Sequence, residues 1–83
     1  MAKDLKYGKV TLEKSSIGED EPVVVFRARD KLLLKVLAYY HLFCLKEGSP
    51  RKHLDLILDA HKIVKDWQST NETKVPDSKE YNG

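Results

Sequence analysis

The feature that most constrains this chain is the segment from Lys31 to Lys46, which is apolar on almost every side of a helix. Its apolar positions are Leu32, Leu33, Leu34, Val36, Leu37, Tyr39, Tyr40, Leu42, Phe43, Cys44 and Leu45. A helix that is apolar all round has to be covered on several sides. A second helix and a small sheet can cover only part of it, so the segment predicts self-association, and we expect a homo-oligomer.

The short length of the chain favours the same expectation. A chain of 83 residues buries only about 60% of the surface that its unfolded form exposes. Domains this small usually gain stability from disulfides, a metal or a partner subunit. Cys44 is the only cysteine, which excludes a disulfide within the chain. Together with the three histidines it shows no paired metal-ligand spacing, so we predict no metal and no cofactor.

Two helices are predicted, joined by a short turn. Asp30 is a good N-cap for a helix from Lys31 to about Lys46. Gly48 is placed to end that helix in the left-handed conformation. Ser49 and Pro50 then suit the N-cap and first position of a second helix, which runs from Pro50 to about Gln68. A turn this short makes the two helices antiparallel neighbours.

The N-terminal third favours β-structure. Gly8–Ser15 alternates apolar and polar residues, and Val23–Arg29 is rich in β-branched residues. We expect them to pair as an antiparallel hairpin, although the connecting loop is long enough for other pairings, and we expect Met1–Lys6 to be a loose start. The predicted fold class is therefore α+β: an N-terminal β-hairpin, then an antiparallel two-helix hairpin, as one domain over residues 1–68. Residues 69–83 are polar and predicted to be a disordered tail.

Charge and hydropathy exclude several classes of protein. Fifteen Lys and Arg against thirteen Asp and Glu leave a net charge of +2, which is too small to indicate nucleic-acid binding. The helix pair has the outline of a helix-turn-helix, but its second helix exposes Asp55, Asp59 and Asp66, which phosphates would repel. No apolar run is long enough for a signal peptide or a membrane span. We therefore expect a cytoplasmic protein.

The chain shows no catalytic motif. It has no serine in a nucleophile elbow and no glycine-rich phosphate loop. Cys44 lies within an apolar helix, where a thiol is usually inert. Asp55, Asp59 and Asp66 alternate with Lys62 on a regular helix face, which indicates solvation. We predict that the protein is not an enzyme.

Two basic clusters are the candidate binding residues. Arg27 and Arg29, two residues apart on a strand, would share a face and lead into the start of the first helix, where an anion is favoured. The alternative is that they face water or pair with the acidic loop. Arg51, Lys52 and His53 would occupy the first turn of the second helix, where cations oppose the helix dipole unless an anion is near.

The second cluster also has an alternative, in which Arg51 simply pairs with Asp55 at a solvated cap. Tyr40 adds a flat ring on which a base can stack, although aromatic residues at helical spacing more often belong to a core. His41 and His61 are expected to be hydrogen-bonded interior histidines rather than ligands.

The stretch from Asp30 to Trp67 resembles a known family. An Asp-capped apolar helix, the turn Ser49-Pro50-Arg51-Lys52 and a second helix that ends near Trp67 resemble the helical hairpin of phage anti-Thoeris sponge proteins and the related anti-CBASS sponges. The N-terminal β portion does not match them. The resemblance implies a non-catalytic homo-oligomer that sequesters a cyclic nucleotide between subunits, in the host cytoplasm. By position, the resemblance implies that the ligand is bound by Arg27, Arg29, Tyr40, Arg51, Lys52 and His53.

The sequence thus favours a phage-type, anti-defence protein that binds a small phosphate-bearing ligand. Two alternatives stay open. One is a protein–protein inhibitor or adaptor that uses the spare apolar helix face, and the less favoured one is a small nucleic-acid-binding protein.

Overall fold

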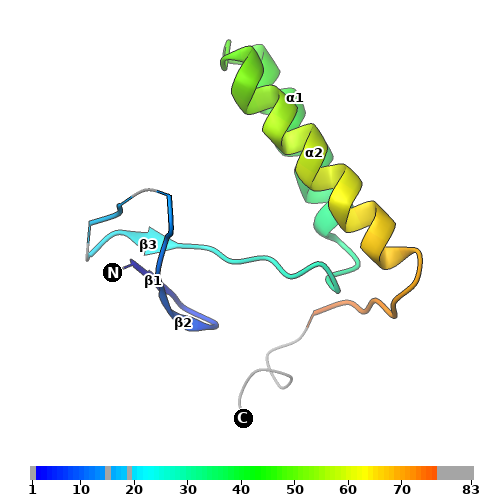
Figure 1. Ribbon diagram of the computed structural model, residues 1–83, viewed down its shortest axis with the longest axis horizontal. Coiled ribbons are helices and arrows are strands. Elements are labelled where there is room, and N and C mark those ends of the chain that lie inside the picture. Colours follow the sequence, from blue (N-terminus) through cyan, green and yellow to red (C-terminus); the bar gives the residue numbers. More distant parts are fainter. Residues whose placement is uncertain (1, 15, 19, 77–83) are drawn as a thin grey trace. The chain divides into compact units, whose positions relative to one another are not determined.

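The computed structural model describes the whole chain except residues 1, 15, 19 and 77–83. It confirms the α+β class, with a small N-terminal sheet followed by two helices (Figure 1). The chain divides into two compact units. The sheet unit comprises the described residues up to Phe26 together with Pro76, and the helical unit is Arg27–Val75.

The sheet has three short strands: β1 (Ala2–Asp4), β2 (Gly8–Val10) and β3 (Pro22–Val23). Their order is β2-β1-β3. β1 pairs antiparallel with β2, so that Lys3 lies opposite Lys9, and parallel with β3, so that Asp4 lies opposite Val23. The hairpin in this sheet is therefore formed by β1 and β2.

The predicted partners of that hairpin were wrong. Met1–Lys6, expected to be a loose start, contains the central strand. Val23–Arg29, expected to be a full strand, contributes only Val23 to β3. The physical reason is that β1 is three residues long and offers no ladder partner beyond Val23. The Val25 amide instead donates to the Asp4 carboxylate, over 2.7 Å.

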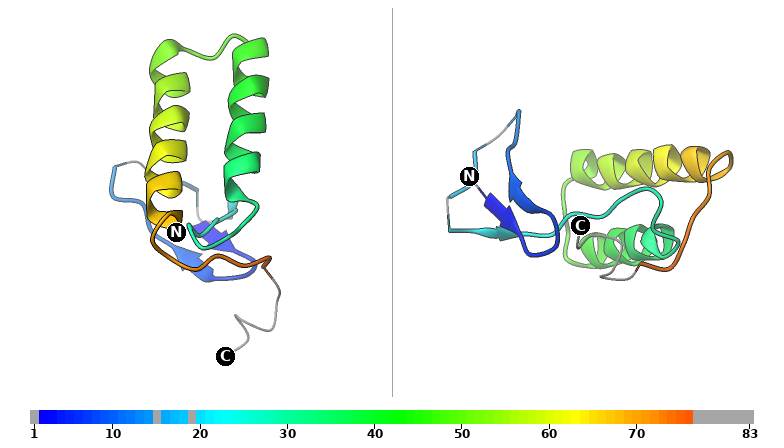
Figure 2. Two further views of the ribbon diagram at one scale, coloured as in Figure 1. Left: turned by 90° about the vertical axis from the view of Figure 1, so that its right-hand side faces the viewer. Right: turned by 90° about the horizontal axis from the view of Figure 1, so that it is seen from below.

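The helical unit contains α1 (Leu33–Lys46) and α2 (Arg51–Gln68). They run antiparallel, side by side (Figure 2), which confirms the predicted hairpin. α1 begins two residues later than expected, after a turn in which the Asp30 carboxylate accepts the Leu32 amide over 2.7 Å. The predicted Asp30 N-cap was wrong, because Leu32 occupies that position; Asp30 instead stabilises the turn that leads into the helix.

The turn between the helices confirms the role of Gly48, which has φ of +79°. The Gly48 amide donates to Leu45 O over 3.2 Å, and the Ser49 amide donates to Cys44 O over 2.9 Å. This pair of bonds is the Schellman motif. The expected Ser49 cap was wrong: Pro50 occupies the N-cap position of α2, without a side-chain cap bond, and the helix begins at Arg51.

Hydrogen bonds hold together the end of the hairpin opposite the turn, where α1 begins and α2 ends. The Gln68 side-chain amide donates to Ala28 O over 2.8 Å and to Asp30 O over 3.1 Å. Further on, the Lys74 amide donates to Arg29 O over 3.0 Å, and the Lys31 amide donates to Lys74 O over 2.9 Å. The helical unit therefore continues past Gln68 to Val75. Residues 77–83 of the predicted tail lie outside the described residues.

The apolar core of the described residues is small. It consists of Leu33, Cys44 and Ile57. Many large apolar side chains of both helices stay exposed: Leu32, Val36, Tyr39, Tyr40, Leu42, Phe43, Leu45, Leu56, Leu58, Ile63 and Trp67. The second helix therefore leaves much of the apolar surface of α1 uncovered, and α2 adds apolar surface of its own.

Candidate binding site

Four of the six predicted ligand-binding residues gather at the end of the hairpin where the turn lies, called the loop end below. Arg51, Lys52 and His53 form the first turn of α2. Tyr40 reaches them from α1: its hydroxyl oxygen lies 3.5 Å from His53 Nε2, and the two rings meet edge to face with centroids 6.0 Å apart. The loop end thus combines an aromatic pair with two flexible cations.

Tyr40 also interacts with the residue one turn along its own helix. A hydrogen bond with the Cys44 side chain raises the pKa of Tyr40, and the nearby sulfur and burial raise it further. The phenol therefore stays neutral at ordinary pH, and a neutral hydroxyl can both donate and accept a hydrogen bond.

Arg51 makes one ion pair, with Asp55 one turn along α2. The distance from Arg51 Nε to Asp55 Oδ1 is 3.5 Å, and both side chains are exposed, at 89% and 56%. This is the pairing that the solvated-cap interpretation expected. Exposed pairs of this kind contribute about 0–1 kcal/mol, so a phosphate can compete with Asp55 for the guanidinium. The first turn of α2 contains no acidic residue that would oppose such an anion.

The other two predicted residues lie at the opposite end of the hairpin. Arg27 and Arg29 precede α1, which at 14 residues rises about 21 Å. They are not on a strand, so the expected shared strand face was wrong. One copy of the chain does not bring the two clusters together. The short turn already required this, because it makes consecutive helices start at opposite ends of a hairpin.

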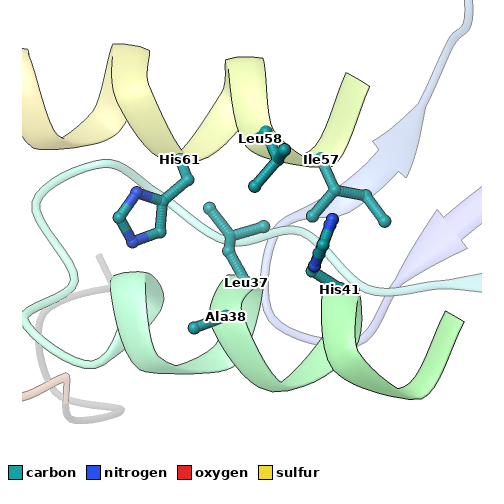
Figure 3. Close-up of a pocket in the computed structure, with 6 residues that line it drawn as sticks. All are labelled: Leu37, Ala38, His41, Ile57, Leu58 and His61. Atoms are coloured by element: carbon teal, nitrogen blue, oxygen red, sulfur yellow. The ribbon is translucent and has the colours of Figure 1, made fainter. Parts of the chain in front are cut away.

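The structure adds a cavity between the helices that the sequence did not predict. It has a volume of about 190 Å³ and is lined by Leu37, Ala38, His41, Ile57, Leu58 and His61. Figure 3 shows His41 on α1 and His61 on α2, with Leu37 between them. The only signal in the sequence was that both histidines lie beside apolar stripes.

The described residues offer neither a metal-binding cluster nor a membrane-spanning helix. No group of three or more His, Cys, Asp or Glu in that part of the chain is arranged to hold a metal ion. No helix there is long and apolar enough to cross a membrane. Comparison with known proteins adds no assignment: no protein-family model matches the chain, and neither a curated protein nor a solved structure matches it significantly.

Proposed function

We propose that this protein is a non-enzymatic binding protein that self-associates through its helical hairpin and captures a small phosphate-bearing ligand at its loop end. The observation that carries the proposal is the gathering of Tyr40, His53, Arg51 and Lys52 at one end of two helices whose apolar surface is largely exposed. The ligand is held and not transformed.

The chemistry of the loop end supports a phosphate-bearing ligand with a flat ring. A guanidinium binds two phosphate oxygens as a fork, and an ammonium acts as a point charge. Free amides at the start of α2 add further donors. The exposed ring of Tyr40 offers a stacking surface for a base.

The resemblance to phage sponge proteins makes cyclic nucleotides the first ligands to test, and anti-defence sequestration the proposed role. Sequestration needs tight binding without turnover, which agrees with a site built from cations and an aromatic ring. We place the protein in the cytoplasm, where a reducing environment would keep the buried, free Cys44 thiol reduced.

Titration calorimetry of the full chain against cyclic dinucleotides, cyclic oligonucleotides, mononucleotides and inorganic phosphate tests the ligand proposal. We expect at least one nucleotide to bind, and Arg51→Ala/Lys52→Ala to weaken its binding by about tenfold or more, since each charge-assisted bond contributes about 1.5–3 kcal/mol. Lys65→Ala, which removes a cation from the last turn of α2, is the matched control. Heat signals that are absent for every ligand, or unchanged in the double variant, would contradict the proposal.

The second basic cluster has its own test in the same assay. If Arg29 contributes to the same ligand, Arg29→Lys should lower affinity, because lysine keeps the charge but loses the guanidinium fork. If Arg29→Lys binds like the wild type, the ligand site is confined to the loop end.

An adaptor or inhibitor function is the second candidate, and the exposed apolar side chains of α2 favour it. Leu56 and Ile63 are 58% and 68% exposed, as expected of a surface that docks on another protein. Light scattering separates the two functions. A monomer that binds no nucleotide favours the adaptor, whereas a stable oligomer favours the proposed function.

A further inference from the structure

Each helix of the hairpin carries an exposed apolar stripe with the spacing of a coiled-coil seam. On α1 and the turn before it, the stripe is Leu32, Val36, Tyr39 and Phe43. On α2 it is Leu56, Ala60, Ile63 and Trp67. Both stripes are spaced by four, three and four residues, the a/d pattern that packs one helix against another. All but the half-buried Ala60 are exposed.

The two stripes lie on the same face of the hairpin, called the stripe face below. On each helix the stripe begins about a quarter-turn from the buried positions, Leu33 and Cys44 on α1 and Ile57 on α2. The two helices run antiparallel, so residues that are displaced in the same direction along the sequence from the buried residues of each helix lie on the same side of the hairpin. Both stripes are displaced in this way. The Tyr40–His53 contact lies toward that side, whereas the cavity lined by His41, Leu58 and His61 lies toward the other.

The stripe face has the size and composition of an interface. Its seven large side chains are between 38% and 68% exposed. For side chains of their size, this amounts to roughly 700 Å², and a standard protein interface takes about 800 Å² from each partner. Its three aromatic residues, Tyr39, Phe43 and Trp67, belong to the residue types that are enriched in interface cores.

The two outer edges of the hairpin carry opposite charges. The outer edge of α1, turned away from α2, presents Lys35 and Lys46. The outer edge of α2 presents Asp55, Asp59 and Asp66, flanked by Lys52 and Lys62; all of these residues are exposed. When a second copy stacks on this face, both edges pair with opposite charge only if α2 of one copy lies over α1 of the other. The basic edge of each copy then meets the acidic edge of its partner.

We propose that two copies of the chain stack through the stripe face, with α1 of each copy over α2 of its partner. The two-fold axis then runs parallel to the helices, and neighbouring helices across the interface are antiparallel, as in a four-helix bundle. The inference rests on the self-association part of the proposed function and specifies its geometry. Its functional consequence is that both loop ends lie at the same end of the dimer.

This arrangement completes the ligand site. Two copies of Tyr40, Arg51, Lys52 and His53 are brought to one end of the dimer. The partner copy thus contributes half of the binding residues. The symmetric ligand that fits such a site carries two phosphates, and the stoichiometry is one ligand for each dimer.

The first test is the mass of the full chain in solution, by light scattering at tens of micromolar. We expect a dimer, and we expect Phe43→Glu/Ile63→Glu to be a monomer with unchanged helical circular dichroism, because both positions are exposed in the single chain. Leu58→Glu is the control, since Leu58 is 51% exposed on the opposite face; it should stay dimeric. A monomeric wild type would overturn the proposal, as would a dimer disrupted only by Leu58→Glu.

The second test distinguishes the proposed stacking from one that places α1 over α1. Lys35→Glu and Asp59→Lys should each weaken the dimer severalfold at low salt, because each places like charges together at two symmetric positions. The charge-swapped variant Lys35→Glu/Asp59→Lys should restore wild-type affinity. If the swapped chain is as weak as the two single changes combined, the α1-over-α2 geometry is wrong.

Ligand binding and dimerisation are measured separately, so their failures are distinguishable. A dimer that binds no nucleotide supports the stacking and contradicts the ligand proposal. A wild type that binds nucleotide as a monomer supports the ligand proposal and overturns the stacking.

Discussion

At the scale of single residues, Asp4 does the most to position its surroundings. Its carboxylate is buried, at 4% exposed. It accepts the amides of Lys6 and Tyr7 at Oδ1, over 2.8 and 2.7 Å, and the amide of Val25 at Oδ2, over 2.7 Å. One side chain therefore holds both the turn after β1 and the segment after β3.

The two oxygens of Asp4 make a selective prediction possible. Asparagine keeps one acceptor oxygen but presents an amide donor in place of the other. In Asp4→Asn we expect the Val25 amide to exchange with solvent roughly tenfold faster or more, while the Lys6 and Tyr7 amides change less. Hydrogen exchange by NMR measures this, with Asp20→Asn as the exposed control. Equal acceleration at all three amides would mean that the sheet unit unfolds as a whole.

The pKa of Asp4 gives a second residue-scale prediction. Burial raises it, but the amides of Val25, Tyr7 and Lys6 together outweigh burial, so the pKa is lowered. A lowered pKa stabilises the fold above the unfolded value of about 3.9, and that stability is lost as the pH falls through the folded value. We expect the amide signals of the sheet unit to be constant above about pH 4 and to shift below it. In Asp4→Asn this step should be absent.

At the scale of elements, the hairpin turn depends on one backbone conformation. Gly48 has φ of +79°, and a Cβ there would meet no atom within 4 Å. Substitution therefore costs backbone strain without a steric clash. We expect Gly48→Ala to lower the free energy of unfolding by about 1–2 kcal/mol, measured as a fall in melting temperature of several degrees. Gly18→Ala is the control, since Gly18 has equal space and no positive φ. Equal melting temperatures for the two variants would contradict this account.

Some features of the helices and strands can be predicted from the sequence, and others cannot. The turn between the helices was predictable because Gly48 imposes a local backbone geometry. The helix starts were predicted one or two residues too early, since Leu32 and Pro50 occupy the N-cap positions in place of Asp30 and Ser49. The strands were not predictable, because they are only two or three residues long, too short for a periodic pattern. Their pairing depends on the non-local bond from Val25 to Asp4. The loop-end cluster was predictable from Arg51, Lys52 and His53, but their distance from Arg29 follows only from the antiparallel topology.

At the scale of the whole molecule, the small core is the feature that needs an explanation. Leu33, Cys44 and Ile57 are the apolar residues buried among those that the structure describes, while both stripes of the hairpin are exposed. Burial of apolar surface supplies most of the free energy of folding, at about 25 cal/mol per Å². A chain that leaves so much of this surface open in one copy gains it on association, which couples folding to assembly.

That coupling predicts a melting temperature that depends on protein concentration. If two unfolded chains form one folded dimer, each tenfold rise in concentration adds about 1.4 kcal/mol to the stability of the dimer. Because two chains of 83 residues unfold together, this corresponds to a rise in melting temperature of about 3–6 °C. Scanning calorimetry from about 5 to about 500 µM tests this. Phe43→Glu/Ile63→Glu should melt lower and at the same temperature throughout, because it folds without the stripe-face contact. A wild-type melting temperature that is constant across the range would show that the single chain is stable without a partner, and the exposed stripes would then have to serve another protein.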